Sequence, residues 1–257
     1  RGYTGRLPAP PGLLPAGARH WILAALLPVA TNEDNLFSYR AGLVYKPVAN
    51  GTVYLQTGGH GDGWYPSGQE IHFWPVYPGM PDGLVDGPEA MRRKVRELVR
   101  AGADVIKVAT SGGVLSPTDD PRHAHFRDDE LTALVAEAAA AGRWVMAHAQ
   151  GSDGIKAAVR AGVRSIEHGI YLDDEAIGLM LDRGTWLVPT LVAPRGVLAA
   201  AEAGVPIPES SRRKALEVSE AHADSFRRAV AAGVKVAMGT DSGVTPHGRN
   251  LAELELM

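Results

Sequence analysis

Cysteine is absent from the 257 residues of this chain. Disulfide bonds and thiolate-ligated metal sites are therefore excluded, and any metal ion must be held by histidine, by a carboxylate or by a modified side chain. The absence of cysteine says little about the cellular compartment.

Strong net charge and long apolar runs are absent too. The formal net charge of −3 argues against a nucleic-acid-binding protein, because such proteins usually carry a basic face. No apolar segment approaches the roughly 20 residues needed to cross a membrane. The longest one, residues 21–30 (WILAALLPVA), is interpreted as a buried barrel element rather than as part of a signal peptide. We expect a cytoplasmic protein that contacts neither nucleic acid nor membrane.

What is present, from about residue 51 onward, is a repeating pattern in which an amphipathic stretch ends in glycine and a Val- and Ile-rich run follows at once. The junction glycines are Gly102, Gly142, Gly162, Gly184 and Gly233. Glycine after a helix C-terminus adopts the left-handed conformation without a steric penalty. Nearly continuous apolar runs are typical of strands buried on both faces. Five such units indicate parallel βα repeats with right-handed crossovers.

The amphipathic stretches also have recognisable helix starts. Asp86, Asp128, Asp173 and Pro208 each stand where a cap or a first-turn residue is expected, and they predict helices that end near the junction glycines. An earlier strand begins at residue 51 with GTVYLQTGGH and brings the number of predicted strands to six.

These elements predict an α/β fold, an incomplete (β/α)8 barrel, because a closed barrel of this type needs eight strands. We place the barrel domain at residues 51–257. Residues 1–50 are rich in proline and lack the repeating pattern, so they are assigned to an atypical or truncated N-terminal segment.

Four polar residues lie at the carboxyl ends of four predicted strands: Lys107, His148, His168 and Asp241. Active sites of such barrels are built at that end. Each residue alone has an ordinary explanation, such as a hydrogen-bonded structural histidine or, for Asp241, a helix cap. Lys107 is the hardest to explain in this way, because charge is costly in a buried strand unless it is paired or neutralised. The set as a whole predicts a site.

The motifs around these residues resemble the metal-dependent amidohydrolase superfamily, and in particular its imidazolonepropionase-like and Xaa-Pro dipeptidase-like branch. The matching motifs are ADVIKVATSGGVLSP, MAHAQG, SIEHG and GTDSG, and the resemblance covers residues 51–257. It implies a TIM-like barrel, of which strands 3 to 8 are recognisable, with two divalent metal ions, most often zinc. It further implies that carboxylated Lys107 bridges the two metals, that His148 and His168 bind one of them, and that Asp241 binds the other.

The same resemblance implies a hydrolase of amide or peptide-like C–N bonds, dipeptidase-like or cyclic-amidase-like, that acts on a small amide or a dipeptide. A hydroxide shared by the metals would attack the carbonyl carbon, with Asp241 as general base and then acid. The chemistry fits Lys107, because an amine in an apolar setting has a lowered pKa and can add carbon dioxide as a neutral group. His60 and Gln150 are predicted to contact the substrate, and His247 is a further pocket-lining candidate.

One part of the family pattern is missing. The resemblance implies a His-x-His at the end of strand 1, but the only such motif is His123-Ala124-His125 in a polar loop, which we interpret as a surface or lid loop rather than as the ligands. The chain also begins without methionine and ends inside a helical pattern, so we expect a fragment of a longer protein. An unclosed barrel leaves edge strands that could pair in a homo-oligomer.

Three alternatives remain open at this point. The first is a mononuclear hydrolase of the deaminase or imidazolonepropionase type. The second is a lyase in which Lys107 forms a Schiff base with a carbonyl substrate. The third is a folded fragment that binds no metal and is inactive.

Overall fold

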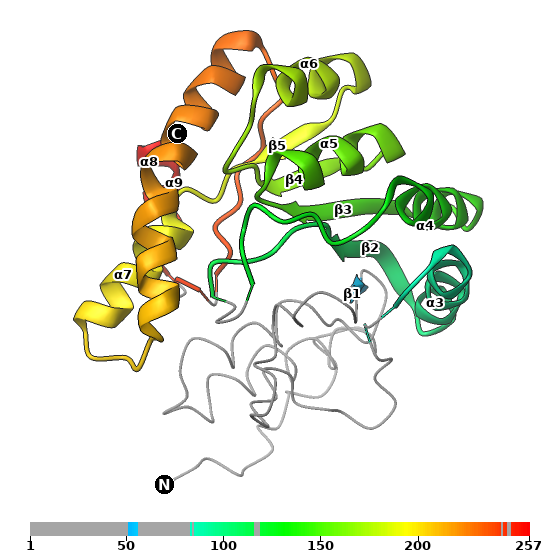
Figure 1. Ribbon diagram of the computed structural model, residues 1–257, viewed down its shortest axis with the longest axis horizontal. Helices are drawn as coiled ribbons and strands as arrows, with labels where there is room; N and C mark the ends of the chain where they lie inside the picture. The colour runs from blue at the N-terminus through cyan, green and yellow to red at the C-terminus, as the bar shows by residue number, and fades with distance from the viewer. Residues whose placement is uncertain (1–50, 56–82, 84, 116–118, 243, 246–247) are drawn as a thin grey trace, which may run out of the picture.

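Figure 1 shows the computed structural model of the chain, which describes residues 51–55, 83, 85–115, 119–242, 244–245 and 248–257. The predictions for the N-terminal segment, for His60 and for His247 lie outside these residues.

The described part of the chain is built on one parallel sheet whose strands follow one another in sequence order. The strands are β1 (Gly51–Leu55), β2 (Ala103–Ala109), β3 (Trp144–Ala149), β4 (Ser165–His168) and β5 (Trp186–Val188). A sixth segment continues the sheet, because Leu187 donates to Lys235 O at 2.8 Å and accepts from Ala237 N at 2.9 Å. The predicted parallel βα repeats of an incomplete barrel are confirmed.

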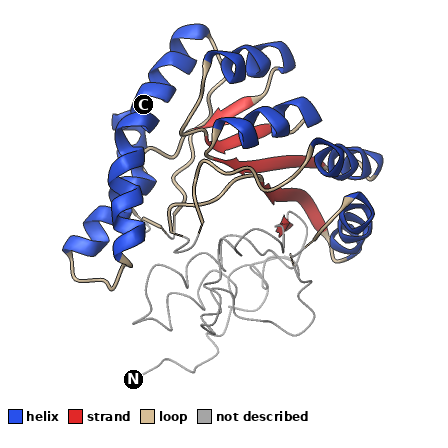
Figure 2. Cartoon of the chain, viewed as in Figure 1, coloured by secondary structure: helices blue, strands red, loops and turns tan. Residues whose placement is uncertain are grey.

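Helices follow the strands, and the four that come after β1, β2, β3 and β4 cover the outer face of the sheet (Figures 1 and 2). In chain order, the helices of the described residues are α3 (Pro88–Arg100), α4 (Asp128–Ala140), α5 (Ser152–Ala161), α6 (Asp174–Arg183), α7 (Val192–Glu202), α8 (Glu209–Ala232) and α9 (Ala252–Leu256). The four predicted helix starts are confirmed to within two residues, whereas α7 was not predicted. All five junction glycines have positive φ, from 64° at Gly184 to 98° at Gly162.

The strand register separates the side chains into two faces. Ile106, Ala147 and Ile166 are completely buried and belong to the core between the sheet and the outer helices. The residues between them in sequence, such as Lys107 and His148, therefore lie on the inner face. The pairing of His148 with Glu167 and of Lys107 with Met146 places all four of these residues on that inner face.

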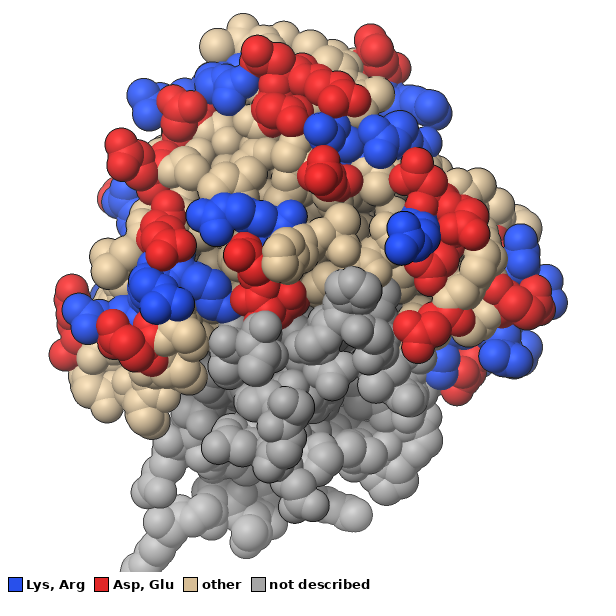
Figure 3. Space-filling model, in the orientation of Figure 1, with Lys and Arg blue, Asp and Glu red and all other residues tan. Residues whose placement is uncertain are grey.

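The surface carries mixed charge. On the face seen in Figure 3, acidic and basic side chains are interspersed over the described residues, and no patch of a single sign covers it.

No helix in the described ranges combines the length and the apolar character that a membrane span requires.

Two helical glycines provide a test of the packing between α5 and the loop after β2. A Cβ on Gly154 would lie 2.6 Å from Thr110 O, whereas a Cβ on Gly178 of α6 would meet nothing within 4 Å. We expect Gly154→Ala to lower the free energy of unfolding by about 1–3 kcal/mol through overpacking. Gly178→Ala should raise it by up to about 1 kcal/mol, because alanine favours the helix. Urea denaturation measures both changes, and equal effects would contradict the close approach at Gly154.

Candidate functional site

The two histidines predicted from the strand ends lie side by side. The ring centroids of His148 and His168 are 4.7 Å apart, in an edge-to-face arrangement at 73°. Both residues are buried, with exposed fractions of 3% and 8%. The charges of Lys107 and Asp241 both act on His148. The carboxyl ends of four strand segments thus bring the four side chains toward one region.

A backbone hydrogen bond fixes the orientation of His148. Its Nε2 lies 3.1 Å from Gly112 O, and because a carbonyl oxygen only accepts, Nε2 carries the proton and Nδ1 the lone pair. Burial, with the nearby charges of His168 and Lys107, lowers the pKa of His148 well below its usual value of 6.5. The ring is therefore neutral at pH 7, which is the state that binds a metal ion.

His168 reaches the same region through an unusual backbone conformation. Strict alternation would direct its side chain to the face opposite Glu167 and His148, since its partner Ala149 belongs to the outer core. The φ of His168 is 76°, in the left-handed region, and this breaks the alternation at the end of β4. Its Nδ1 is 2.7 Å from Thr190 Oγ1, and this hydrogen bond orients the ring.

The left-handed backbone recurs around the site. Among the described residues, the non-glycine positions with positive φ are His168 (76°), Thr190 (54°) and Asp241 (47°), and each follows or ends a strand segment. Such conformations cost about 1–3 kcal/mol each and are concentrated at functional sites. The three positions thus mark this end of the sheet independently of residue type.

The segment around Asp241 is held by hydroxyl and amide groups. Thr240 Oγ1 and Ser242 Oγ are 2.8 Å apart, and Asn250 Nδ2 donates to both, at 3.1 Å and 2.7 Å. Asp241 itself is half-buried. The side chains of the residues on either side of Asp241 are thus linked to each other and to Asn250.

Glu167 was not predicted from the sequence, although it shares the inner face of the sheet. It is buried and accepts a hydrogen bond from Ser165 Oγ at 2.7 Å. Burial raises its pKa, while the charge of Lys107 lowers it and that of Asp241 raises it further. Glu167 therefore lies in the electrostatic field of the same groups. The signal that could have identified it is the one used for Lys107, a charge at an inward position of a buried strand.

Gln150 lies two residues beyond His148 and is buried, at 5% exposed. Its backbone N–H donates to Ser111 Oγ at 2.7 Å. Its side-chain Oε1 has no hydrogen-bond partner among the described residues. A buried amide oxygen of this kind is suited to receive a hydrogen bond from a ligand.

The interpretation of His123-Ala124-His125 as a surface loop is wrong for one of its histidines. His123 is exposed, but His125 is buried, with Nε2 2.8 Å from Asp119 Oδ2. The backbone N–H of His125 also donates to Thr110 O at 3.0 Å, so two hydrogen bonds attach this part of the loop to the protein interior. Because one ring is exposed and the other is paired with Asp119, the motif does not present two ligands to one metal.

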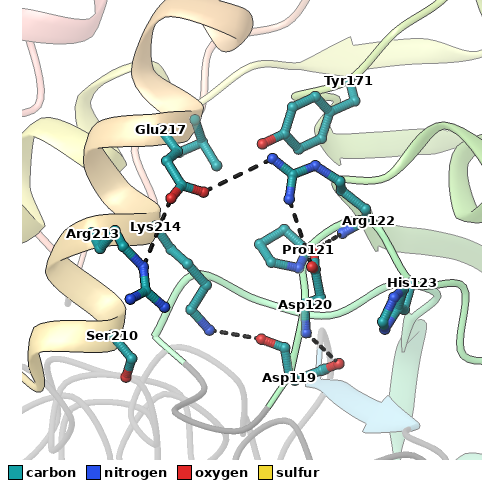
Figure 4. A pocket seen from close by; sticks show the side chains of 11 residues that line it. Asp119, Asp120, Pro121, Arg122, His123, Tyr171, Ser210, Arg213, Lys214 and Glu217 are labelled. Carbon is teal, nitrogen blue, oxygen red and sulfur yellow. Dashed lines mark hydrogen bonds and ion pairs between the residues drawn. The ribbon is translucent and has the colours of Figure 1, made fainter.

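A cavity of about 370 Å³ lies among the loop after β2, the loop after β4 and the first turns of α8 (Figure 4). Its charges are largely paired. Arg122 lies 3.6 Å from Asp120 and 3.8 Å from Glu217, and its guanidinium is 5.2 Å from the centre of the Tyr171 ring. None of the four strand-end residues lines this cavity, so it is distinct from the region where they meet.

The histidine pair fits part of a metal centre. Two buried rings, each with a hydrogen bond at one nitrogen and one with a lowered pKa, match the ligands and supporting contacts of divalent metals. Within the described part of the chain, no three His, Asp or Glu side chains are grouped closely enough to hold a metal ion.

Comparison with known proteins matches residues 56–257 to the amidohydrolase family. Ochratoxinase of Aspergillus niger is 38% identical over 215 residues, which cover 80% of this chain and 44% of that protein. The crystal structure of ochratoxinase superposes with a TM-score of 0.64 at 36% identity, over 82% of this chain and 48% of that one. A Xaa-Pro dipeptidase crystallised with methionine in its active site gives a TM-score of 0.70 at 38% identity, over 81% and 51% of the two chains. The chain thus spans about half the length of these relatives.

Proposed function

Because the chain belongs to the amidohydrolase family, we propose that this protein is a metal-dependent hydrolase of amide or peptide-like C–N bonds. The observation that carries the proposal is the buried pair of His148 and His168, with His148 neutral, at the carboxyl ends of two neighbouring strands. The names of the similar proteins, a Xaa-Pro dipeptidase and an ochratoxinase, support a small amide or dipeptide as substrate.

In this proposal His148 and His168 would hold one divalent metal ion, Asp241 would hold a second, and Lys107, once carboxylated, would be a ligand shared by the two. Zinc suits the histidine ligands. Bound metal ions would supply Lewis acidity toward the amide oxygen and lower the pKa of water to roughly 7. Lys107 fits the bridging role because it lies half-buried on the inner face of β2, where its charge acts on His148 and Glu167.

The residues of the chain would then divide the remaining work. Asp241, half-buried and on a constrained backbone, accepts a proton from the attacking water and delivers it to the leaving nitrogen. Gln150 offers its buried Oε1 to an N–H group of the substrate. His60 is proposed as a second substrate contact.

Metal analysis tests this function directly. We expect the purified protein to contain about two divalent metal ions per chain, most of them zinc. Dialysis against a chelator should abolish dipeptide hydrolysis, and added zinc should restore it. One ion per chain would favour the mononuclear alternative. His148→Ala should lose metal, whereas His125→Gln, a change to a buried histidine of the Asp119 pair, should retain it. A protein that binds no divalent metal, or whose activity survives metal removal, would contradict the proposal.

A further inference from the structure

One face of α8 holds the backbone of two loops that emerge from the carboxyl ends of strands. The polar residues of this face are buried, and each donates to a main-chain carbonyl of the loop after β2, of the last residue of β4 or of the loop after β4. They are Ser211 (to Leu115 O, 3.2 Å), Lys214 (to Gly113 O, 3.3 Å, and Asp119 O, 2.8 Å), His222 (to His168 O, 3.0 Å) and Ser225 (to Ile170 O, 2.7 Å). The helix stands beside the carboxyl ends of these strands in Figure 1.

The contact made by His222 differs from the others because it reaches a residue of the candidate site itself. Its Nε2 lies 3.0 Å from the carbonyl oxygen of His168, and since a carbonyl only accepts, the ring donates. His222 is 1% exposed, and burial lowers its pKa to about 4. The two residues are 54 positions apart in sequence, so the tertiary fold alone creates the contact.

The carbonyl that His222 holds belongs to the strained residue. With φ at 76°, His168 leaves the strand alternation, and its ring comes within 4.7 Å of the His148 ring. A left-handed backbone at a residue other than glycine persists only where the surroundings over-determine it. A hydrogen bond to the carbonyl fixes the peptide plane that follows His168, and with it the direction in which its side chain leaves the backbone.

We propose that His222 is a positioning residue for His168, and that its N–H maintains the backbone conformation that turns the His168 ring toward His148. This inference rests on the proposed function, in which the two rings bind one metal ion. It adds a residue of α8 that touches neither metal nor substrate. Thr190 orients the same ring through Nδ1, so His168 would be held at the backbone by His222 and at the side chain by Thr190.

Replacing the donor tests this role. We expect His222→Leu to lower zinc affinity about 10–100-fold, the range found when groups that support a metal ligand are lost. We expect kcat to fall with little change in KM. His222→Gln should restore most of the affinity, because its amide nitrogen can take the place of Nε2, whereas His222→Asn places its amide near Nδ1 and should not. Zinc affinity is measured by competition with a chromophoric chelator, and the site geometry by the absorption spectrum of the cobalt(II)-substituted protein.

Ser225→Ala is the matched control. Ser225 lies on the same face of α8, is buried, and bonds to Ile170 O and Leu172 N of the same loop. Its loss should lower the melting temperature but leave zinc affinity and the cobalt spectrum unchanged. This separates positioning of His168 from general loosening of α8.

The outcomes are distinct. If His222→Leu does not fold, the difference between the Gln and Asn variants decides the question, and equal zinc affinity in the two overturns the inference. The inference is also overturned if the Leu variant binds zinc as tightly as the wild type, or if Ser225→Ala loses as much affinity. A wild-type protein that binds no zinc overturns the proposed function together with this inference, whereas a zinc-binding wild type with an unaffected Leu variant overturns this inference alone.

Discussion

Replacing Lys107 with alanine is expected to abolish hydrolysis, and short-chain carboxylic acids such as acetate and propionate are expected to restore part of it. Lys107 lies half-buried on the inner face of β2, and its charge acts on His148 and Glu167. A bridging carbamate would contribute two oxygen atoms to the metal ions. Loss of a residue that only supports a metal ligand typically lowers activity by about 10–100-fold. Loss of a ligand itself should therefore reduce kcat/KM by more than about 100-fold. A carboxylic acid in the space left by the side chain supplies the same pair of oxygens.

Steady-state kinetics with increasing acid concentration measure the rescue. Lys107→Arg keeps the positive charge but fills the space and cannot be carboxylated, so it should be inactive without rescue. Lys214→Ala is a second control, because Lys214 is a buried lysine that donates to the carbonyls of Gly113 and Asp119. Any activity that Lys214→Ala loses should not be restored by the carboxylic acids. Full activity of Lys107→Ala without added acid would contradict the bridging role, and a rescue of equal size in Lys214→Ala would show that the acid acts elsewhere.

The repeating part of the fold could be predicted because its signals are local. A glycine after a helix and an apolar run after the glycine are both visible within about ten residues, as at Gly162 and β4. Helix α7 escaped prediction because Pro194 and Gly196 are ordinarily helix-breaking signals. In the structure Pro194 lies in the first turn, where its missing N–H is not needed. Gly196 leaves room for Thr245, whose Cγ2 would clash with a Cβ at that position.

The candidate site could be predicted only in part, for a different reason. Lys107, His148 and Asp241 could be located because strand ends are readable from sequence. His168 was placed correctly at a strand end, but its ring reaches His148 only through a backbone conformation that alternation does not predict. His222 could not have been found, because its role depends on how a distant helix packs against the loop after β4.

Asp241→Asn is expected to lower kcat by about 10²–10⁴-fold, the usual contribution of general acid–base catalysis, with a much smaller change in KM. The amide keeps the size of the side chain and one oxygen but cannot accept the proton of the attacking water. Asparagine is also the replacement that the backbone tolerates, because φ at this position is 47° and Asn adopts left-handed conformations readily. An alanine here would add backbone strain to the chemical change, whereas asparagine removes the base, and the negative charge of the proposed metal ligand, without that strain. The thermal melt should be close to that of the wild type.

A second carboxylate variant separates the role of Asp241 as a base from a general effect of removing a carboxylate near the strand ends. Asp120→Asn is the matched control, because Asp120 is a carboxylate on the loop after β2 that lies 3.6 Å from Arg122. Asp120→Asn should keep the wild-type kcat. An Asp241→Asn variant that retains the wild-type rate would exclude Asp241 as the base, and the buried carboxyl of Glu167, on the inner face beside His148, would become the next group to test.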